Sequence, residues 1–154
     1  MTFRDADEKA RWLDGAAKFD AWHLPKVREL ALRFAKALSH DPNDPDALAH
    51  DFYKFVRDSI RYVPDPGGME QLSDSDVILE QGAGDCDDKA RLFVALCACV
   101  RVPARIRPCF TGEDFVHVQA EVFLQDVGEY VACEFIIRDL PFGEMPRKGK
   151  KILQ

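Results

Sequence analysis

The hydrophobic pattern of the chain changes its period about two thirds of the way along the sequence. In the first part, apolar residues recur at helical spacing, most clearly over residues 25–39 and 45–61. In the last part they alternate with polar residues over 104–107, 115–124 and 130–137, which is typical of half-buried strands. We therefore predict an α+β fold, in which N-terminal helices and one buried helix pack on a C-terminal antiparallel sheet.

The length of 154 residues fits one domain rather than two. We predict a single domain over 1–154, with a helical part over about 1–100, a sheet part over about 104–140 and a basic tail at 147–154. The tail is the pattern of a solvated chain end, and docking on an acidic partner is the alternative.

Charge and hydropathy exclude several classes of protein. The chain carries 21 basic and 27 acidic residues, a net charge of −6, which disfavours general binding of nucleic acids. No apolar stretch approaches the length needed to cross a membrane. The first residues lack the apolar segment of a signal peptide, so we expect a cytoplasmic protein with neither nucleic acid nor membrane as a partner.

The segment Gly-Ala-Gly-Asp-Cys-Asp-Asp, residues 82–88, lies where a loop enters a helix predicted over 86–100. Asp85 is the expected N-cap, and Asp88 completes a capping-box-like pair. Cys86 then lies in the first helical turn, where free N–H groups and the helix dipole favour a thiolate. The neighbouring aspartates oppose that charge, so a nucleophilic Cys86 needs a cationic partner. A buried structural cysteine is the alternative.

His117 and Glu134 are the candidate partners of this cysteine. His117 lies in the middle of a strand, away from the apolar positions, and Glu134 lies in the predicted return strand. A hairpin loop of two or four residues would place both side chains on one face of the sheet, whereas three residues would separate them. A general base and the acid that orients it would need this arrangement. A structural histidine and an exposed strand glutamate are the alternatives.

The five cysteines are an odd number and show no disulfide framework. Cys97 and Cys99 on one helix would point about 200° apart, so they cannot clamp one zinc ion. The aspartates around Cys86 fit helix capping better than a magnesium or calcium site. We therefore predict no metal site and no cofactor.

Taken together, several segments resemble the transglutaminase-like superfamily, whose members share a papain-like Cys–His–Asp arrangement. The resemblance covers about residues 50 to 146 and is carried by residues 60–65, 79–90, 92–96, 102–105, 117–122 and 130–134. It implies that Cys86 is the nucleophile, His117 the base and Glu134 the orienting acid, as in small bacterial or phage members.

Three residues depart from the family pattern. Glu134 stands where the family usually has Asp, Tyr130 replaces a common Trp, and Arg101 replaces a common Gly before Val102. Asp139 is a rival orienting acid, but it falls on the core-facing positions of its strand, so we prefer Glu134.

The resemblance implies cysteine-dependent acyl transfer on a peptide or protein amide, by hydrolysis or by transamidation, through a thioester acyl-enzyme. The N–H of Cys86 is the expected first oxyanion donor and Gln81 a candidate second one. We favour hydrolysis. The alternatives are a catalytically silent binding module of the same fold, or an assembly protein of a phage particle. The sequence does not indicate an oligomeric state.

Overall fold

The computed structural model describes residues 5–37, 44–64, 72–110, 116–135 and 142. The helices and strands in chain order are α1 (Ala6–His23), α2 (Pro25–Ala37), α3 (Pro45–Ser59), β1 (Arg61–Tyr62), α4 (Ser75–Gln81), β2 (Ala83–Gly84), α5 (Cys86–Cys99), β3 (Ala104–Phe110), β4 (Val116–Leu124) and β5 (Glu129–Cys133). The predicted α+β class is confirmed. The basic tail and the predicted strand residues beyond 135 lie outside the described residues.

Local capping signals start four of the helices. Asp5, Asp44, Asp74 and Asp85 are N-caps whose side chains accept hydrogen bonds from N–H groups of the first turn. Asp44 precedes Pro45, whose fixed φ angle suits the first helical position. The predicted start of α3 is therefore confirmed.

The three-stranded sheet has the order β3-β4-β5, with both pairs antiparallel. Leu124 pairs with Glu129, which leaves a hairpin loop of four residues, 125–128. Glu121 pairs with Ala132, so odd positions of β4 share a face with even positions of β5. This is the parity that the sequence required for His117 and Glu134.

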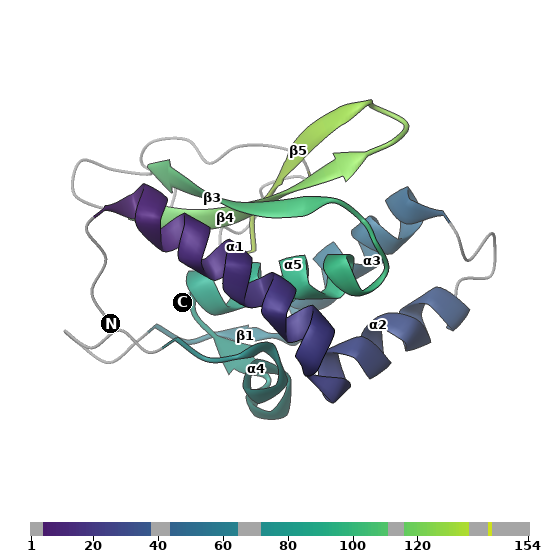
Figure 1. The fold of residues 1–154 in the computed structure, drawn as a ribbon, viewed down its shortest axis with the longest axis horizontal. Helices are drawn as coiled ribbons and strands as arrows, with labels where there is room; N and C mark the ends of the chain where they lie inside the picture. Colours follow the sequence, from purple (N-terminus) through teal and green to yellow (C-terminus); the bar gives the residue numbers. More distant parts are fainter. Residues whose placement is uncertain (1–4, 38–43, 65–71, 111–115, 136–141, 143–154) are drawn as a thin grey trace.

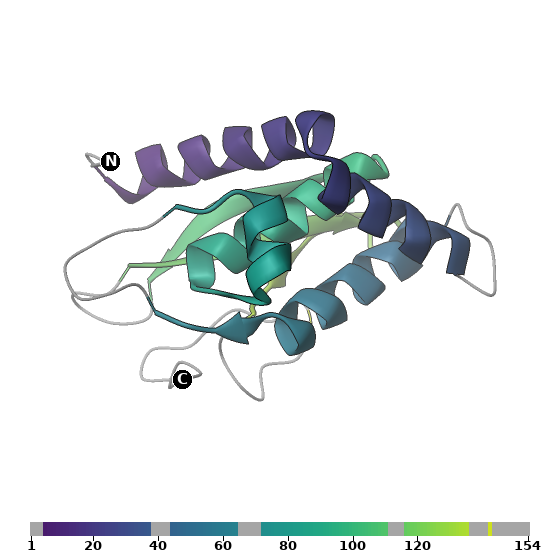
Figure 2. The same cartoon turned by 90° about the horizontal axis from the view of Figure 1, so that it is seen from below.

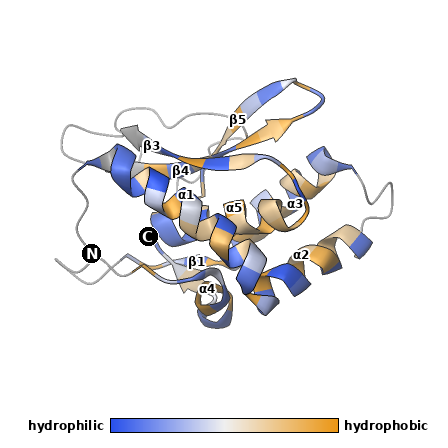
Figure 3. Cartoon of the chain, in the orientation of Figure 1, coloured by the Kyte–Doolittle hydropathy of each residue, from blue (hydrophilic) through white to orange (hydrophobic). Residues whose placement is uncertain are grey.

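Helix α5 is the centre of the molecule. It packs against the sheet and against the four other helices, and Figures 1 and 2 show it enclosed between β3 and β4 on one side and α1, α3 and α4 around it. All eleven residues from Asp87 to Cys97 are buried. In Figure 3 hydrophilic residues lie at the first turn of α1, at both ends of α2 and along α4. The predicted buried helix is confirmed.

A buried ion pair ties α1 to α5. Nε and Nη2 of Arg91 donate hydrogen bonds to the two oxygens of the Asp20 carboxylate, at 2.7 and 2.9 Å. The backbone N–H and the hydroxyl of Ser75, the first residue of α4, donate to the same carboxylate at 3.1 and 2.7 Å. The indole of Trp12 lies 5.5 Å from the Arg91 guanidinium. These contacts satisfy both buried charges and fix three helices relative to one another.

A short parallel ladder holds the loop that precedes α5. Arg61 N–H donates to the carbonyl of Gly82, and Val63 N–H donates to that of Gly84, each at 2.9 Å. The pairing of β1 with β2 therefore anchors the chain directly before the cysteine helix.

In the part of the chain that the structure describes, no helix combines the length and the apolar character that a membrane crossing needs.

Candidate active site

The start of α5 is held by the predicted capping box. Asp88 N–H donates to the Asp85 side chain at 3.0 Å, and Asp85 N–H donates to the Asp88 side chain at 3.2 Å. Gly84 makes this possible, since a Cβ at its position would lie 2.6 Å from the Asp88 Cβ. The glycine before Asp85 is therefore needed for the close approach of the loop to the capping carboxylate.

Cys86 is the first residue of α5, and its side chain is half-buried. Its thiol donates to Asp87 Oδ1 at 3.5 Å. Burial, followed by the charges of Asp87 and Asp85, raises the pKa of the Cys86 thiol well above its ordinary value. A backbone hydrogen bond from Val118 and the charge of Lys9 act in the opposite direction on this pKa. Cys86 therefore needs further positive charge to become a thiolate near neutral pH, as the sequence indicated.

Lys9 supplies one cation near the thiol. This residue of α1 forms an ion pair with Asp87, with 2.6 Å between Nζ and Oδ2. The pair compensates part of the negative charge beside Cys86. Sequence reasoning missed Lys9, because 78 positions separate it from Asp87 and no local pattern connects them.

His117 is described through its backbone only. It lies in β4 and pairs with Cys109 of β3, while its side chain lies outside the described residues. Its neighbour Val118 is the residue whose backbone hydrogen-bonds the Cys86 thiol. The fold therefore brings the backbone of β4 at His117 next to the start of α5.

Glu134 directly follows β5 and is 2% exposed. Its Oε1 accepts the N–H of Phe135 at 3.0 Å, and its backbone carbonyl accepts the Tyr53 hydroxyl at 3.1 Å. The prediction of a strand over 130–137 was wrong at this point, since β5 ends at Cys133. Here the Glu134 carbonyl and the Phe135 N–H form hydrogen bonds with side chains, instead of the bonds to a neighbouring strand that they would form in a sheet.

Lys89 lies one turn after Cys86 and is 1% exposed. Its ammonium donates to the carbonyls of Arg57 and Phe135, at 3.3 and 3.2 Å. Burial lowers the pKa of Lys89 to about 8, and the charges of Asp58 and Glu134 oppose this shift. Sequence reasoning did not single out this residue, since a lysine in a helix is usually solvated.

The two predicted oxyanion donors differ in their surroundings. Within the described residues, the backbone N–H of Cys86 has no hydrogen-bond acceptor, as is usual for the first residue of a helix. Gln81 is the last residue of α4, and its side chain is exposed. Its role stays a prediction. The rival acid Asp139 lies outside the described residues.

The other described cysteines are ordinary core thiols. Burial raises the pKa of Cys97 and Cys133 well above its ordinary value, and that of Cys99 to about 11. Among the described residues, no group of three or more histidine, cysteine, aspartate or glutamate side chains could hold a metal ion.

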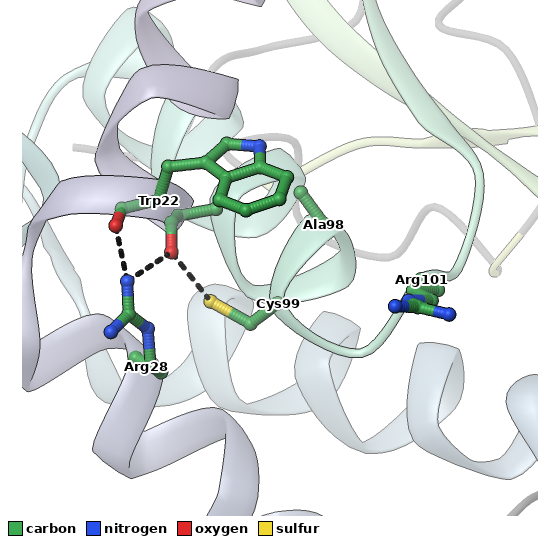
Figure 4. Close-up of a pocket in the computed structure, with 6 residues that line it drawn as sticks. Trp22, Arg28, Ala98, Cys99 and Arg101 are labelled. Carbon is green, nitrogen blue, oxygen red and sulfur yellow. Dashed lines mark hydrogen bonds between the residues drawn. The ribbon is translucent and has the colours of Figure 1, made fainter.

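A cavity of about 530 Å³ opens at the opposite end of α5 from Cys86. Figure 4 shows the Trp22 indole above Cys99, with Arg28 on one side and Arg101 on the other. Arg28 donates to the carbonyls of Ala21 and Trp22, and the Cys99 thiol donates to that of Ala21 at 3.9 Å. These groups satisfy the last carbonyls of α1, which is a structural role.

The comparisons with known proteins agree with the fold. The model of the transglutaminase-like superfamily matches residues 32–135, and the chain belongs to this family. The match includes all four predicted site residues: Gln81, Cys86, His117 and Glu134. No protein with a curated function matches the chain.

Solved structures show the same fold at low sequence identity. One is described, provisionally, as a cysteine protease from Cytophaga hutchinsonii; it is 19% identical, with a TM-score of 0.54 over 71% of this chain and 36% of its own length. A protein from Parabacteroides distasonis, provisionally described as a protease, is 11% identical, with a TM-score of 0.64 over 86% of this chain and 27% of its own.

The periplasmic domain of TgpA from Pseudomonas aeruginosa is a third relative. It is 16% identical, with a TM-score of 0.54 over 79% of this chain and 49% of its own length. The chain thus spans between about a quarter and a half of these solved relatives.

Proposed function

We propose that the protein catalyses cysteine-dependent acyl transfer on a peptide or protein amide, with Cys86 as nucleophile, His117 as base and Glu134 as orienting acid. One observation carries the proposal. The Cys86 thiol lies at the first turn of α5 against the backbone of Val118, the residue after His117. Family membership and the provisional description of two solved relatives as proteases support it.

The sheet register supports the pairing of the other two residues. His117 occupies an odd position of β4, and Glu134 occupies the next even position after Ala132, which pairs with Glu121. The register of β4 and β5 would place both residues on one face of the hairpin if the alternation ran on by one residue past Cys133, the last residue of β5. A carboxylate that hydrogen-bonds one imidazole nitrogen leaves the other nitrogen for the thiol, and it stabilises the imidazolium.

The proposed reaction forms and breaks one bond in each half. The Cys86 thiolate attacks the amide carbonyl carbon, and the N–H of Cys86 donates to the developing oxyanion, with Gln81 as a candidate second donor. The C–N bond then breaks, and the His117 imidazolium protonates the leaving amine. In the second half, water attacks the thioester carbonyl carbon and gives a proton to His117. The C–S bond breaks, which releases an acid and restores the Cys86 thiolate and the His117 imidazolium, whereas attack by an amine in place of water gives a new amide. We favour hydrolysis.

Alkylation of Cys86 by iodoacetamide tests the proposal without a known substrate. A thiolate–imidazolium pair would keep Cys86 reactive at about pH 6 to 7, below the pKa of about 8.5 of a free thiol. We expect this low-pH reactivity in the wild-type chain and its loss in His117→Ala. The matched control is Cys86→Ala, which identifies labelling of the other cysteines by mass spectrometry.

A catalytically silent binding module is the second candidate. It is favoured by the raised pKa of the Cys86 thiol and by the aspartates on both sides of it. An alkylation midpoint at or above that of a free thiol, unchanged in His117→Ala, would support this candidate and refute the enzyme.

The cytoplasmic location stays a prediction, and one solved relative is a periplasmic domain.

A further inference from the structure

We propose that Lys89, assisted by Tyr53, is a positioning residue that holds Glu134 at a fixed place relative to the helix of Cys86. This inference rests on the proposed function, because it concerns the acid that would orient His117. It assigns a role to a buried lysine that the proposed reaction does not use.

Lys89 joins α5 to the segment that follows β5. Lys89 belongs to α5, three residues after Cys86, and its ammonium donates to the carbonyl of Phe135 at 3.2 Å. The side chain of Glu134 is itself bonded to the N–H of Phe135 at 3.0 Å. Lys89 therefore connects the helix that carries the thiol to the peptide segment that sets the direction of the carboxylate.

Tyr53 holds the preceding carbonyl of the same segment. The Tyr53 hydroxyl donates to the carbonyl of Glu134 at 3.1 Å, and Lys89 also donates to the carbonyl of Arg57 at 3.3 Å. Tyr53 and Arg57 both belong to α3. Two consecutive carbonyls after β5 are thus held by side chains of α3 and α5, and the segment has bonds to both helices.

Burial of the Lys89 ammonium group makes this arrangement electrostatically unfavourable. Lys89 is 1% exposed, and burial of an ammonium group disfavours its charged form. The acids whose charges act on it are Asp58 of α3 and Glu134. An apolar side chain of similar length would fill the same space without this cost. Filling space alone therefore does not explain a buried lysine here, whereas hydrogen bonds to the carbonyls of Arg57 and Phe135 do.

The test is a double-mutant cycle on the pH profile of Cys86 alkylation by iodoacetamide. The variants are Lys89→Met, Tyr53→Phe and Glu134→Gln, alone and with Lys89→Met and Glu134→Gln combined. We expect Lys89→Met to move the alkylation midpoint upward by about one pH unit, a roughly tenfold loss of rate at about pH 6.5. Tyr53→Phe should shift the midpoint in the same direction by a smaller amount. In a chain that already carries Glu134→Gln, adding Lys89→Met should not shift the midpoint further.

Lys54→Met, at an exposed position of the neighbouring α3, is the matched control and should leave the midpoint unchanged. Thermal unfolding checks that each variant is folded at the assay temperature. If Lys89→Met is not folded, Lys89→Gln and Tyr53→Phe carry the same comparison. A purely structural lysine would change the unfolding temperature but not the midpoint.

The outcomes separate this inference from the proposed function. If Glu134→Gln shifts the midpoint but the Lys89 and Tyr53 variants do not, the inference is overturned and the triad stands. If Lys89→Met shifts the midpoint equally with and without Glu134→Gln, Lys89 does not act through this acid, which also overturns the inference. If Glu134→Gln has no effect, the orienting role of Glu134 fails, and the positioning role of Lys89 fails with it.

Discussion

Replacement of Gly84 by alanine tests whether the loop before Cys86 depends on close contact with the capping box. The new Cβ would lie 2.6 Å from the Asp88 Cβ and 2.9 Å from its Oδ2. These distances are far inside van der Waals contact, so the Asp88 side chain must move. It would then lose its bonds to the N–H groups of Asp85 at 3.2 Å and Ser73 at 3.4 Å.

The expected magnitude follows from these losses. A broken cap costs about 1 kcal/mol, and a buried N–H without an acceptor costs about 1–3 kcal/mol. Reduced freedom of the unfolded chain returns about 0.4–1 kcal/mol. We expect Gly84→Ala to lower the free energy of unfolding by about 1–3.5 kcal/mol and the unfolding temperature by roughly 2–14 °C.

Two other glycines of the chain serve as matched controls. Gly82 has a φ of 63° at the end of α4, and no heavy atom lies within 4 Å of the place that an added Cβ would take. Gly82→Ala should therefore cost only about 1 kcal/mol of backbone strain. Gly15 lies in α1 with open space around it, so Gly15→Ala should stabilise the chain by about 0.5–1 kcal/mol. Calorimetry of the three variants would refute the reasoning if Gly84→Ala unfolded at or above the temperature of Gly82→Ala.

Three further changes have expected outcomes of defined sign. Arg91→Met leaves the buried Asp20 carboxylate without its counter-charge, so urea unfolding should show a loss of about 3–5 kcal/mol; a loss below about 1 kcal/mol would contradict this. Asp46→Ala removes the acceptor of two N–H groups in the β4–β5 loop, at 2.7 and 2.9 Å. It should cost about 1–3 kcal/mol and speed hydrogen exchange in the hairpin, whereas unchanged exchange would refute it. Because burial lowers the pKa of Lys89 from 10.5 to about 8, the unfolded chain binds more of this proton between those pH values. The free energy of unfolding of the wild-type chain should therefore rise by about 2 kcal/mol relative to that of Lys89→Met between about pH 7.5 and pH 10. If the two free energies, measured by urea unfolding, ran parallel over this pH range, this expectation would be ruled out.

Local signals in the sequence were sufficient for the longer helices and for the three antiparallel strands, but they missed the short ladder of β1 and β2. Asp44 and Pro45 marked the start of α3, and Asp85 with Asp88 marked the start of α5. These predictions succeeded because a cap is decided within four residues. The even positions of β4 from Val118 to Leu124 belong to the hydrophobic core, as the alternation predicted, although Gln119 and Glu121 on the other face are buried as well. The four-residue hairpin loop gave the expected parity.

The end of β5 could not be predicted in the same way. An alternating pattern continues past Cys133, but Tyr53, 81 positions away, takes the carbonyl of Glu134. Lys89, 46 positions away from Phe135, takes the next carbonyl. The Asp20–Arg91 pair spans 71 positions. No periodicity encodes such contacts, because they depend on how the finished elements pack.

The salt bridge between Asp20 and Arg91 also bears on which segment can fold by itself. The family match begins at residue 32, yet Asp20 lies upstream of that boundary and neutralises a charge in the middle of α5. A fragment that begins at residue 32 would keep every proposed catalytic side chain, but the buried Arg91 guanidinium would lose its Asp20 counter-charge. Truncation to the matched region is therefore expected to yield an unstable polypeptide, and expression trials should retain α1 from its cap at Asp5 onward.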